Sequence, residues 1–238
     1  PNDPKSIESM VCRDDPQKPL LGSMGIYLFK TDVLIDLLEK NTDDDFGGEI
    51  IPAAIKTHRV YGYDFEGFWE DIGTIRTFYD TNLALTLPNP PFNFFDPAKP
   101  IYSHPRFLPG SVITNCHMEE TLLSEGCRIT DADIKHSVIG LRSQIRSGVM
   151  IRDSILMGND YYERDWISEG RKLPLQISDN CSIEGAIIDK NARLGSNVTI
   201  KPFPRGFDLD GDQWVVRDGI VVIPKNAEIL PDTIIAPQ

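Results

Sequence analysis

The stretch RITDADIKHSVIGLRSQIRSGVMI, residues 128–151, places an isoleucine at positions 129, 134, 139, 145 and 151. The pattern returns further along the chain at Ile177, Ile183, Ile188, Leu194 and Ile200. A spacing of five or six with small or polar residues between is typical of a hexapeptide parallel β-helix, whose stacked coils bury one apolar side chain per short strand. A β-sandwich would instead show strict alternation with turns about every 8 to 12 residues. We therefore expect a β-helix.

Two segments interrupt this repeat. Residues 159–174, NDYYERDWISEGRKLP, form a polar insertion between coils. Residues 203–216, FPRGFDLDGDQWVV, predict a hairpin that turns at Asp210 and Gly211.

The part of the chain that precedes the repeat predicts alternating α and β elements. Residues 23–30, SMGIYLFK, predict a short buried strand, and residues 60–65 and 67–72 predict two more. A helix should begin at Thr31 or Asp32, and a second should cover residues 47–58. Thr74 is suited to cap a third helix that ends by Pro88. Along one stripe of this helix lie Ile75, Phe78, Tyr79, Asn82 and Leu83.

A proline-rich segment, LPNPPFNFFDPAKP at residues 87–100, separates these two parts. Proline cannot continue a helix or a central strand, so the segment predicts a linker. We place the domain boundary after residue 87.

Composition excludes several classes of protein. Of the 238 residues, 40% are hydrophobic and 25% are charged, and apolar runs are short, so we expect a globular chain without membrane spans. A net charge of −12 and a pI near 4.7 argue against nucleic-acid binding. The four cysteines form no CxxC pair and predict free thiols in a reducing compartment. The start PNDPKSIESM has no initiator Met or signal peptide, so we expect a piece of a longer protein.

Three polar residues are candidates for chemistry. Asp71 in WEDIGT follows a predicted strand, where a carboxylate can hold Mg²⁺ against phosphate oxygens, or it can merely cap the next helix. Ser23 precedes a predicted strand and suits a sugar hydroxyl or phosphate, or lies in a solvated turn. Glu49 adjoins two glycines that allow close ligand approach, or it is a first-turn acid of a helix.

Seven motifs occur in the order found in glucose-1-phosphate adenylyltransferase, also called ADP-glucose pyrophosphorylase, particularly its cyanobacterial and plant-like forms. They are SMGIYLF, DFGGEIIP, GFWEDIGTIRTFYDTNLAL, PIYSHPRFLP, HSVIGLRS, DSILMGNDYYE and IIDKNARLG. The chain resembles this family from about residue 20 to its end. The resemblance implies that residues 1–87 are the C-terminal part of a Rossmann-like α/β nucleotidyltransferase domain. Residues 88–238 would be a linker and a left-handed β-helix domain for regulation and oligomerisation.

The resemblance also implies a reaction: ATP and glucose 1-phosphate give ADP-glucose and pyrophosphate in glycogen or starch synthesis. Ser23 and Glu49 would bind glucose 1-phosphate, and Asp71 would share Mg²⁺ with an aspartate that precedes this chain. The Gly-rich nucleotide loop and a sugar-phosphate lysine of the family would also precede it, so we expect the 238 residues alone to be inactive.

Regulation and assembly follow from the same resemblance. Arg106, Lys190 and Lys225 match basic positions that bind anionic effectors, with 3-phosphoglycerate activating and phosphate inhibiting. The implied assembly is a homo- or hetero-tetramer, in a bacterial cytoplasm or a plastid stroma.

Two other readings compete with this one. The chain could be a non-catalytic regulatory subunit of the same family. It could also be a hexapeptide acyltransferase with a catalytic histidine, for which His117 and His136 are available, but then WEDIGT would have no purpose.

Overall fold

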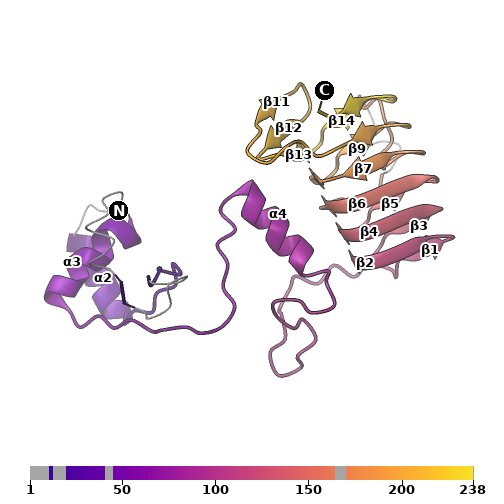
Figure 1. The fold of residues 1–238 in the computed structure, drawn as a ribbon. Helices are drawn as coiled ribbons and strands as arrows, with labels where there is room; N and C mark the ends of the chain where they lie inside the picture. The colour runs from indigo at the N-terminus through magenta and orange to yellow at the C-terminus, as the bar shows by residue number, and fades with distance from the viewer. Residues whose placement is uncertain (1–10, 13–19, 41–44, 164–169, 238) are drawn as a thin grey trace. The chain divides into compact units, whose positions relative to one another are not determined.

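The computed structural model describes residues 11–12, 20–40, 45–163 and 170–237. The chain forms two compact units, one up to Trp69 and one from Glu70 onward, and each is described by itself below (Figure 1).

The described part of the first unit is helical. It contains α2 (Thr31–Lys40), a π-helical turn η1 (Phe46–Ile50) and α3 (Ile51–Thr57). Both predicted helices are confirmed. Their core is small, with Leu37, Ile50 and Ala54 buried beneath Phe29, Val33 and Phe46.

The three strands predicted in residues 23–30, 60–65 and 67–72 are wrong, because these segments are irregular in the structure. Ile26 and Leu28 are 72% and 99% exposed instead of buried. A strand persists only where a neighbouring strand satisfies its backbone groups, and no described segment of this unit pairs with these residues. The apolar pattern in these segments therefore corresponds to exposed side chains and not to a buried strand.

Helix α4 (Ile75–Ala84) begins as predicted at Thr74. The Thr74 hydroxyl accepts the backbone N–H of Thr77, while the Thr77 hydroxyl accepts the N–H of Thr74, which forms a capping box. The helix ends before Pro88, and the proline-rich segment that follows has only turns, as expected for a linker.

The second unit is the predicted parallel β-helix, and its coils form the successive rungs of Figure 1. One face is a parallel ladder of β1 (Val112–Thr114), β3 (Arg128–Thr130) and β5 (Gln144–Ile145). A bridge at Ile177 continues this ladder to β9 (Arg193–Leu194) and β14 (Glu228–Ile229).

A larger sheet supplies the other faces. Its long strands are β2 (His117–Leu123), β4 (Ala132–Ile139) and β6 (Val149–Leu156). Above them lie β7 (Ser182–Glu184), β10 (Thr199–Ile200) and β15 (Ile234–Ile235) on one path. The second path is β8 (Ala186–Ile188) and β13 (Ile220–Ile223).

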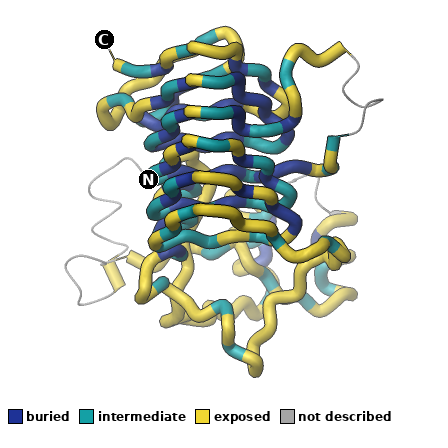
Figure 2. Tube along the Cα trace, turned by 90° about the vertical axis from the view of Figure 1, so that its right-hand side faces the viewer, coloured by how far each residue is buried: buried dark blue, intermediate teal, exposed yellow. Residues whose placement is uncertain are grey.

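Strand register explains the repeat found in the sequence. The paired residues form three inward columns, and the buried interior of the coils is visible in Figure 2. The columns are Ile113, Ile129, Ile145, Ile177, Leu194 and Ile229; Ile134, Ile151, Ile183, Ile200 and Ile235; and Ile139, Leu156, Ile188 and Ile223. All ten repeat positions named from the sequence are at most 4% exposed. Stacking buries what a single coil cannot.

The predicted hairpin is also confirmed. Strand β11 (Leu209–Asp210) pairs antiparallel with β12 (Val215–Arg217), which pairs antiparallel with β13. Gly211 donates its N–H to the Trp214 carbonyl across the turn. The other insertion lies between β6 and β7 as expected, and its residues 164–169 lie outside the described residues.

Helix α4 packs against the β-helix. Tyr79 and Leu83 are buried with Ile155, Ile187 and Ile220, and the Tyr79 hydroxyl donates to the Asp153 carbonyl at 2.5 Å. By packing, α4 therefore belongs to the β-helix unit. The compact units divide after Trp69, whereas the change in composition lies at residue 88.

Among the described residues, no helix is both long and apolar enough to cross a membrane.

Candidate functional site

Ser23 belongs to a polar cluster in the first unit. Its hydroxyl accepts the N–H of Gly25 at 3.2 Å and lies 3.4 Å from the Tyr27 hydroxyl. The Tyr27 ring stacks on Phe46, with ring centroids 5.9 Å apart, so the two hydroxyls lie at the start of η1. Two exposed hydroxyls beside an aromatic ring can hydrogen-bond a sugar.

Glu49 lies in the same helix start. Asp45 caps η1, and its Oδ1 accepts the N–H groups of Gly47 and Gly48 at 2.8 and 3.1 Å. The Glu49 Oε2 accepts the Asp45 N–H at 3.4 Å. A Cβ on Gly48 would lie 2.9 Å from Asp45 Oδ2, so a larger residue there would require the Asp45 carboxylate to shift. Glu49 thus acts as a first-turn acid of the helix and remains exposed to a ligand.

Tyr27 and Asp45 were not among the site residues predicted from the sequence. Both carried a local signal: Tyr27 lies four residues after Ser23, and Asp45 opens the Asp-x-Gly-Gly turn, in which a carboxylate caps the following backbone. Through Tyr27 and Phe46, the structure brings Ser23 to the turn that holds Glu49.

Asp71 lies in an exposed turn just before α4. Its Oδ1 accepts the Gly73 N–H at 2.9 Å, and its Oδ2 accepts no hydrogen bond from a described residue. The reading in which Asp71 caps the helix is wrong, because Thr74 is the cap.

The position of Asp71 suits Mg²⁺. This ion is commonly held by one or two carboxylates together with substrate phosphates and water. Within the described ranges, no three His, Cys, Asp or Glu side chains converge into a metal site.

Lys190 and Lys225 meet at one corner of the β-helix. They follow β8 and β13, which are adjacent strands, and both ammonium groups contact Asp160. Lys190 Nζ lies 3.0 Å from Asp160 Oδ1, and Lys225 Nζ lies 2.7 Å from Asp160 Oδ2. The side chains of Lys190 and Lys225 are 37% and 50% exposed, so this is an open cationic site.

Buried asparagine supports this corner. Asn191 is 3% exposed and has a φ of +61°, the left-handed conformation that asparagine tolerates well. Its Nδ2 donates to Asp160 Oδ2 at 3.1 Å and to Asn226 Oδ1 at 3.2 Å, and its Oδ1 accepts the Asp160 N–H at 2.8 Å. The hydrogen bond from Lys225, followed by that from Lys190, holds the pKa of Asp160 well below its usual range.

Asp160 was not among the predicted site residues. It lies in the polar insertion, where sequence spacing gives no indication that it meets Lys225, which is 65 residues further on. Only the stacking of coils joins them.

Arg106 lies apart from the two lysines. Arg106 is exposed and precedes β1, whereas Lys190 precedes β9. In the parallel ladder, the rows of β3, β5 and Ile177 lie between β1 and β9. At about 4.8 Å per row, the four steps correspond to roughly 19 Å along the stack. The structure therefore brings together two of the three predicted effector residues within this chain.

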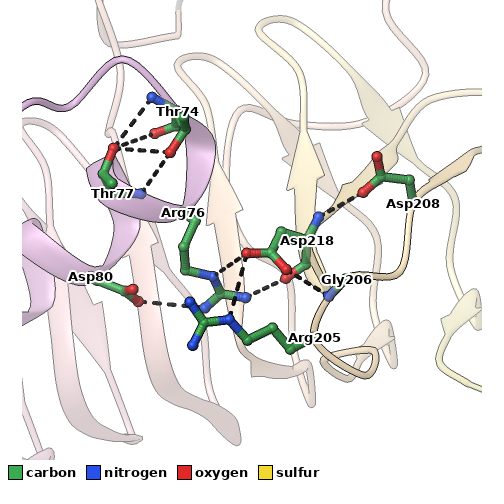
Figure 3. A network of polar contacts seen from close by, with 8 residues as sticks. All are labelled: Thr74, Arg76, Thr77, Asp80, Arg205, Gly206, Asp208 and Asp218. Carbon is green, nitrogen blue, oxygen red and sulfur yellow. Dashed lines mark hydrogen bonds and ion pairs between the residues drawn. The ribbon is translucent and has the colours of Figure 1, made fainter. Parts of the chain in front are cut away.

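A further polar network joins the first turn of α4 to Asp218, which lies between β12 and β13 (Figure 3). Arg76 Nε donates to Asp218 Oδ2 at 2.9 Å, and Arg76 also contacts Asp80 and the Asp218 carbonyl. Asp218 Oδ1 accepts the Gly206 N–H at 2.6 Å, and Arg205 lies 3.9 Å from Asp218 Oδ2. The hydrogen bond from Arg76 lowers the pKa of Asp218.

Two family models match the chain. Residues 106–234, more than half of it, match the model described as the GLGC left-handed parallel beta-helix domain. Residues 6–87 match the model described as Nucleotidyl transferase. Ser23, Glu49 and Asp71 lie in the second match, and Arg106, Lys190 and Lys225 lie in the first.

Proposed function

The chain belongs to the family of the GLGC left-handed parallel beta-helix domain and carries a nucleotidyl transferase region before it, and from this combination we propose an adenylyl transfer. The substrates are ATP and α-D-glucose 1-phosphate, and the products are ADP-glucose and pyrophosphate, in glycogen or starch synthesis. The observation that carries the proposal is the joint presence, in one chain, of both family matches with Asp71 exposed in the first of them.

Ser23, Tyr27 and Glu49 take the sugar in this proposal. The two hydroxyls and the exposed carboxylate offer donors and acceptors to sugar hydroxyl groups. A phosphate oxygen of glucose 1-phosphate attacks the α-phosphorus of ATP, and the bond to the bridging oxygen of the β-phosphate breaks as pyrophosphate leaves. No covalent intermediate with the protein is required, so the residues act by positioning.

Asp71 is the proposed ligand of Mg²⁺. When bound, the ion would neutralise charge on the phosphate oxygens. The chain contributes Oδ2, which accepts no hydrogen bond from the described residues, while the Gly73 N–H fixes Oδ1 and so orients the carboxylate.

The β-helix is the proposed regulatory and assembly domain. Lys190 and Lys225 bind an anionic effector such as 3-phosphoglycerate or phosphate, because two ammonium groups at one open corner suit phosphate oxygens. Arg106 would join them only from another part of a tetramer, since it lies several coils away within this chain.

The test is pyrophosphate release by the full chain in its parent protein. Asp71→Asn should lower kcat by about 100-fold or more, since it removes a charge that acts on the reacting phosphates. Glu70→Gln is the matched control and should change kcat by less than about threefold. Equal, small effects of both variants would contradict the role of Asp71, whereas absence of pyrophosphate release by the unchanged parent protein would favour a non-catalytic subunit.

Two more measurements complete this test. The 238 residues alone should show no turnover, and pyrophosphate release by them would contradict the proposal that further catalytic residues are needed. Lys190→Glu in the parent protein should weaken the response to effector while sparing the basal rate, and an unchanged response would count against the effector site.

A further inference from the structure

We propose that Asp160 is a built-in competing anion of the Lys190–Lys225 site, which an anionic effector must displace before it can bind both lysines. This inference rests on the proposed effector role of the two lysines. It adds the residue that sets how much effector the site requires.

The geometry gives Asp160 the place of a ligand. Its two carboxylate oxygens are divided between two ammonium groups, Oδ1 to Lys190 at 3.0 Å and Oδ2 to Lys225 at 2.7 Å. A phosphate or carboxylate would bridge the same two groups in the same way. The low pKa of Asp160 means that it is charged at neutral pH, as a competitor must be.

When the carboxylate leaves, it gives up its two ion pairs and the hydrogen bond from Asn191 Nδ2, which keeps its other bond to Asn226. The Asp160 backbone N–H is held by the buried Asn191, and this bond does not involve the carboxylate. Further along the insertion, the Glu163 carboxylate pairs with the fully buried Arg193 and also accepts the Leu175 N–H at 2.8 Å. Backbone position is therefore fixed by neighbours, while the Asp160 side chain is 35% exposed and has room to turn toward water.

The charges set the direction of the effect. The corner holds the two ammonium groups together with the carboxylates of Asp160 and of Asp189, which accepts the Lys190 N–H at 2.6 Å. An arriving dianion is attracted by the ammonium groups and repelled by the Asp160 carboxylate that lies between them. At about 4 Å in water, removal of one such repulsion corresponds to on the order of fivefold in affinity. The affinity for the effector rises further because the two ammonium groups no longer have to release the Asp160 carboxylate before they bind it.

Asp160→Asn is the direct test, because asparagine keeps the shape and can still accept from Asn191 while it removes the charge. Binding of inorganic phosphate, and separately of 3-phosphoglycerate, is measured by calorimetry on the full chain at constant ionic strength. We expect Asp160→Asn to bind both anions about fivefold more tightly than the unchanged protein.

The matched control is Asp210→Asn. It also removes the charge of one aspartate from an ion pair, here the pair with Arg217 at 2.6 Å on the hairpin, where the Asp210 side chain is 75% exposed. This control should leave anion affinity within about twofold. Asp160→Asn affinity that is equal to or weaker than that of Asp210→Asn overturns the proposal.

A Lys190→Gln, Lys225→Gln double variant separates this inference from the proposed function. If the double variant binds anions as well as the unchanged protein, the effector site itself is wrong, and the inference falls with it. If the double variant loses binding and Asp160→Asn gains none, only the role of Asp160 is overturned. Asp160→Ser repeats the charge removal with a smaller side chain, so that misfolding of one variant, monitored by circular dichroism, leaves the other to decide.

Discussion

The docking of α4 on the β-helix gives the sharpest quantitative prediction. Leu83 is 5% exposed and packs with Tyr79 against Ile155, Ile187 and Ile220. Leu83→Ala removes three buried carbon atoms and leaves a cavity, which costs about 3 kcal/mol by comparison with similar core truncations.

This cost should fall on α4 alone. The contacts of Leu83 belong to a small cluster that is separate from the three-column core of the coils, so the helix can open while the β-helix stays folded. A loss of about 3 kcal/mol raises the population of the opened helix by roughly 100-fold. Amide hydrogen exchange of residues 79–84 should accelerate by that factor under native conditions.

The control for this experiment is Ile75→Ala on the same helix. Ile75 is 37% exposed and lies outside the buried cluster, so its truncation should accelerate exchange by less than about fivefold. Exchange from β6 should be unchanged in both variants. A Leu83→Ala acceleration below about threefold, or an equal acceleration in β6, would refute the reasoning that α4 is held by this contact and opens independently.

Three further predictions concern the β-helix unit, and the first of them has a glycine outside that unit as its control. Gly158→Ala should lower the free energy of unfolding by about 3 kcal/mol, because φ is +79° and the new Cβ would lie 2.2 Å from a backbone carbonyl oxygen. The control Gly62→Ala, whose Cβ would meet no atom within 4 Å, should lower it by less than about 0.5 kcal/mol. Both values are measured by urea unfolding. Burial raises the pKa of Cys181 to about 11, so the folded state keeps a proton that the unfolded chain releases; the free energy of unfolding should fall as pH rises from about 9 to 11, and Cys181→Ala should reduce that fall. Asp218 has a lowered pKa in the folded state, so its contribution is present above about pH 4 and is lost as pH falls further; the difference in Tm between the unchanged protein and Arg76→Gln should be constant near neutrality and shrink below that pH.

The β-helix was predictable because its signal is local and repeated. Every coil needs one apolar residue per short strand, so the spacing of the isoleucines directly reflects the repeat of strands in the coil. The register places Ile134 on Ile151 and Ile183, as the period requires. The cap at Thr74 was predictable for the same reason, since a helix start is decided within four residues.

The strand predictions for residues 23–30 and 60–72 show the limit of such patterns. An apolar run indicates that burial of the segment would be favourable. A strand also needs a neighbouring strand to hydrogen-bond with, and a local pattern does not show whether that neighbour is present. Leu28 is therefore almost fully exposed despite its strand-like surroundings.

The sequence by itself determined the β-helix, its interruptions and the helices, because each depends on neighbours within a few residues. Only the tertiary structure decided that Lys190 and Lys225 share Asp160, that Arg106 lies several coils away, and that α4 packs on the coils. These contacts join residues about 30 to 140 positions apart. Which residues meet depends on the number of coils between them, and a short spacing in the sequence does not contain that number.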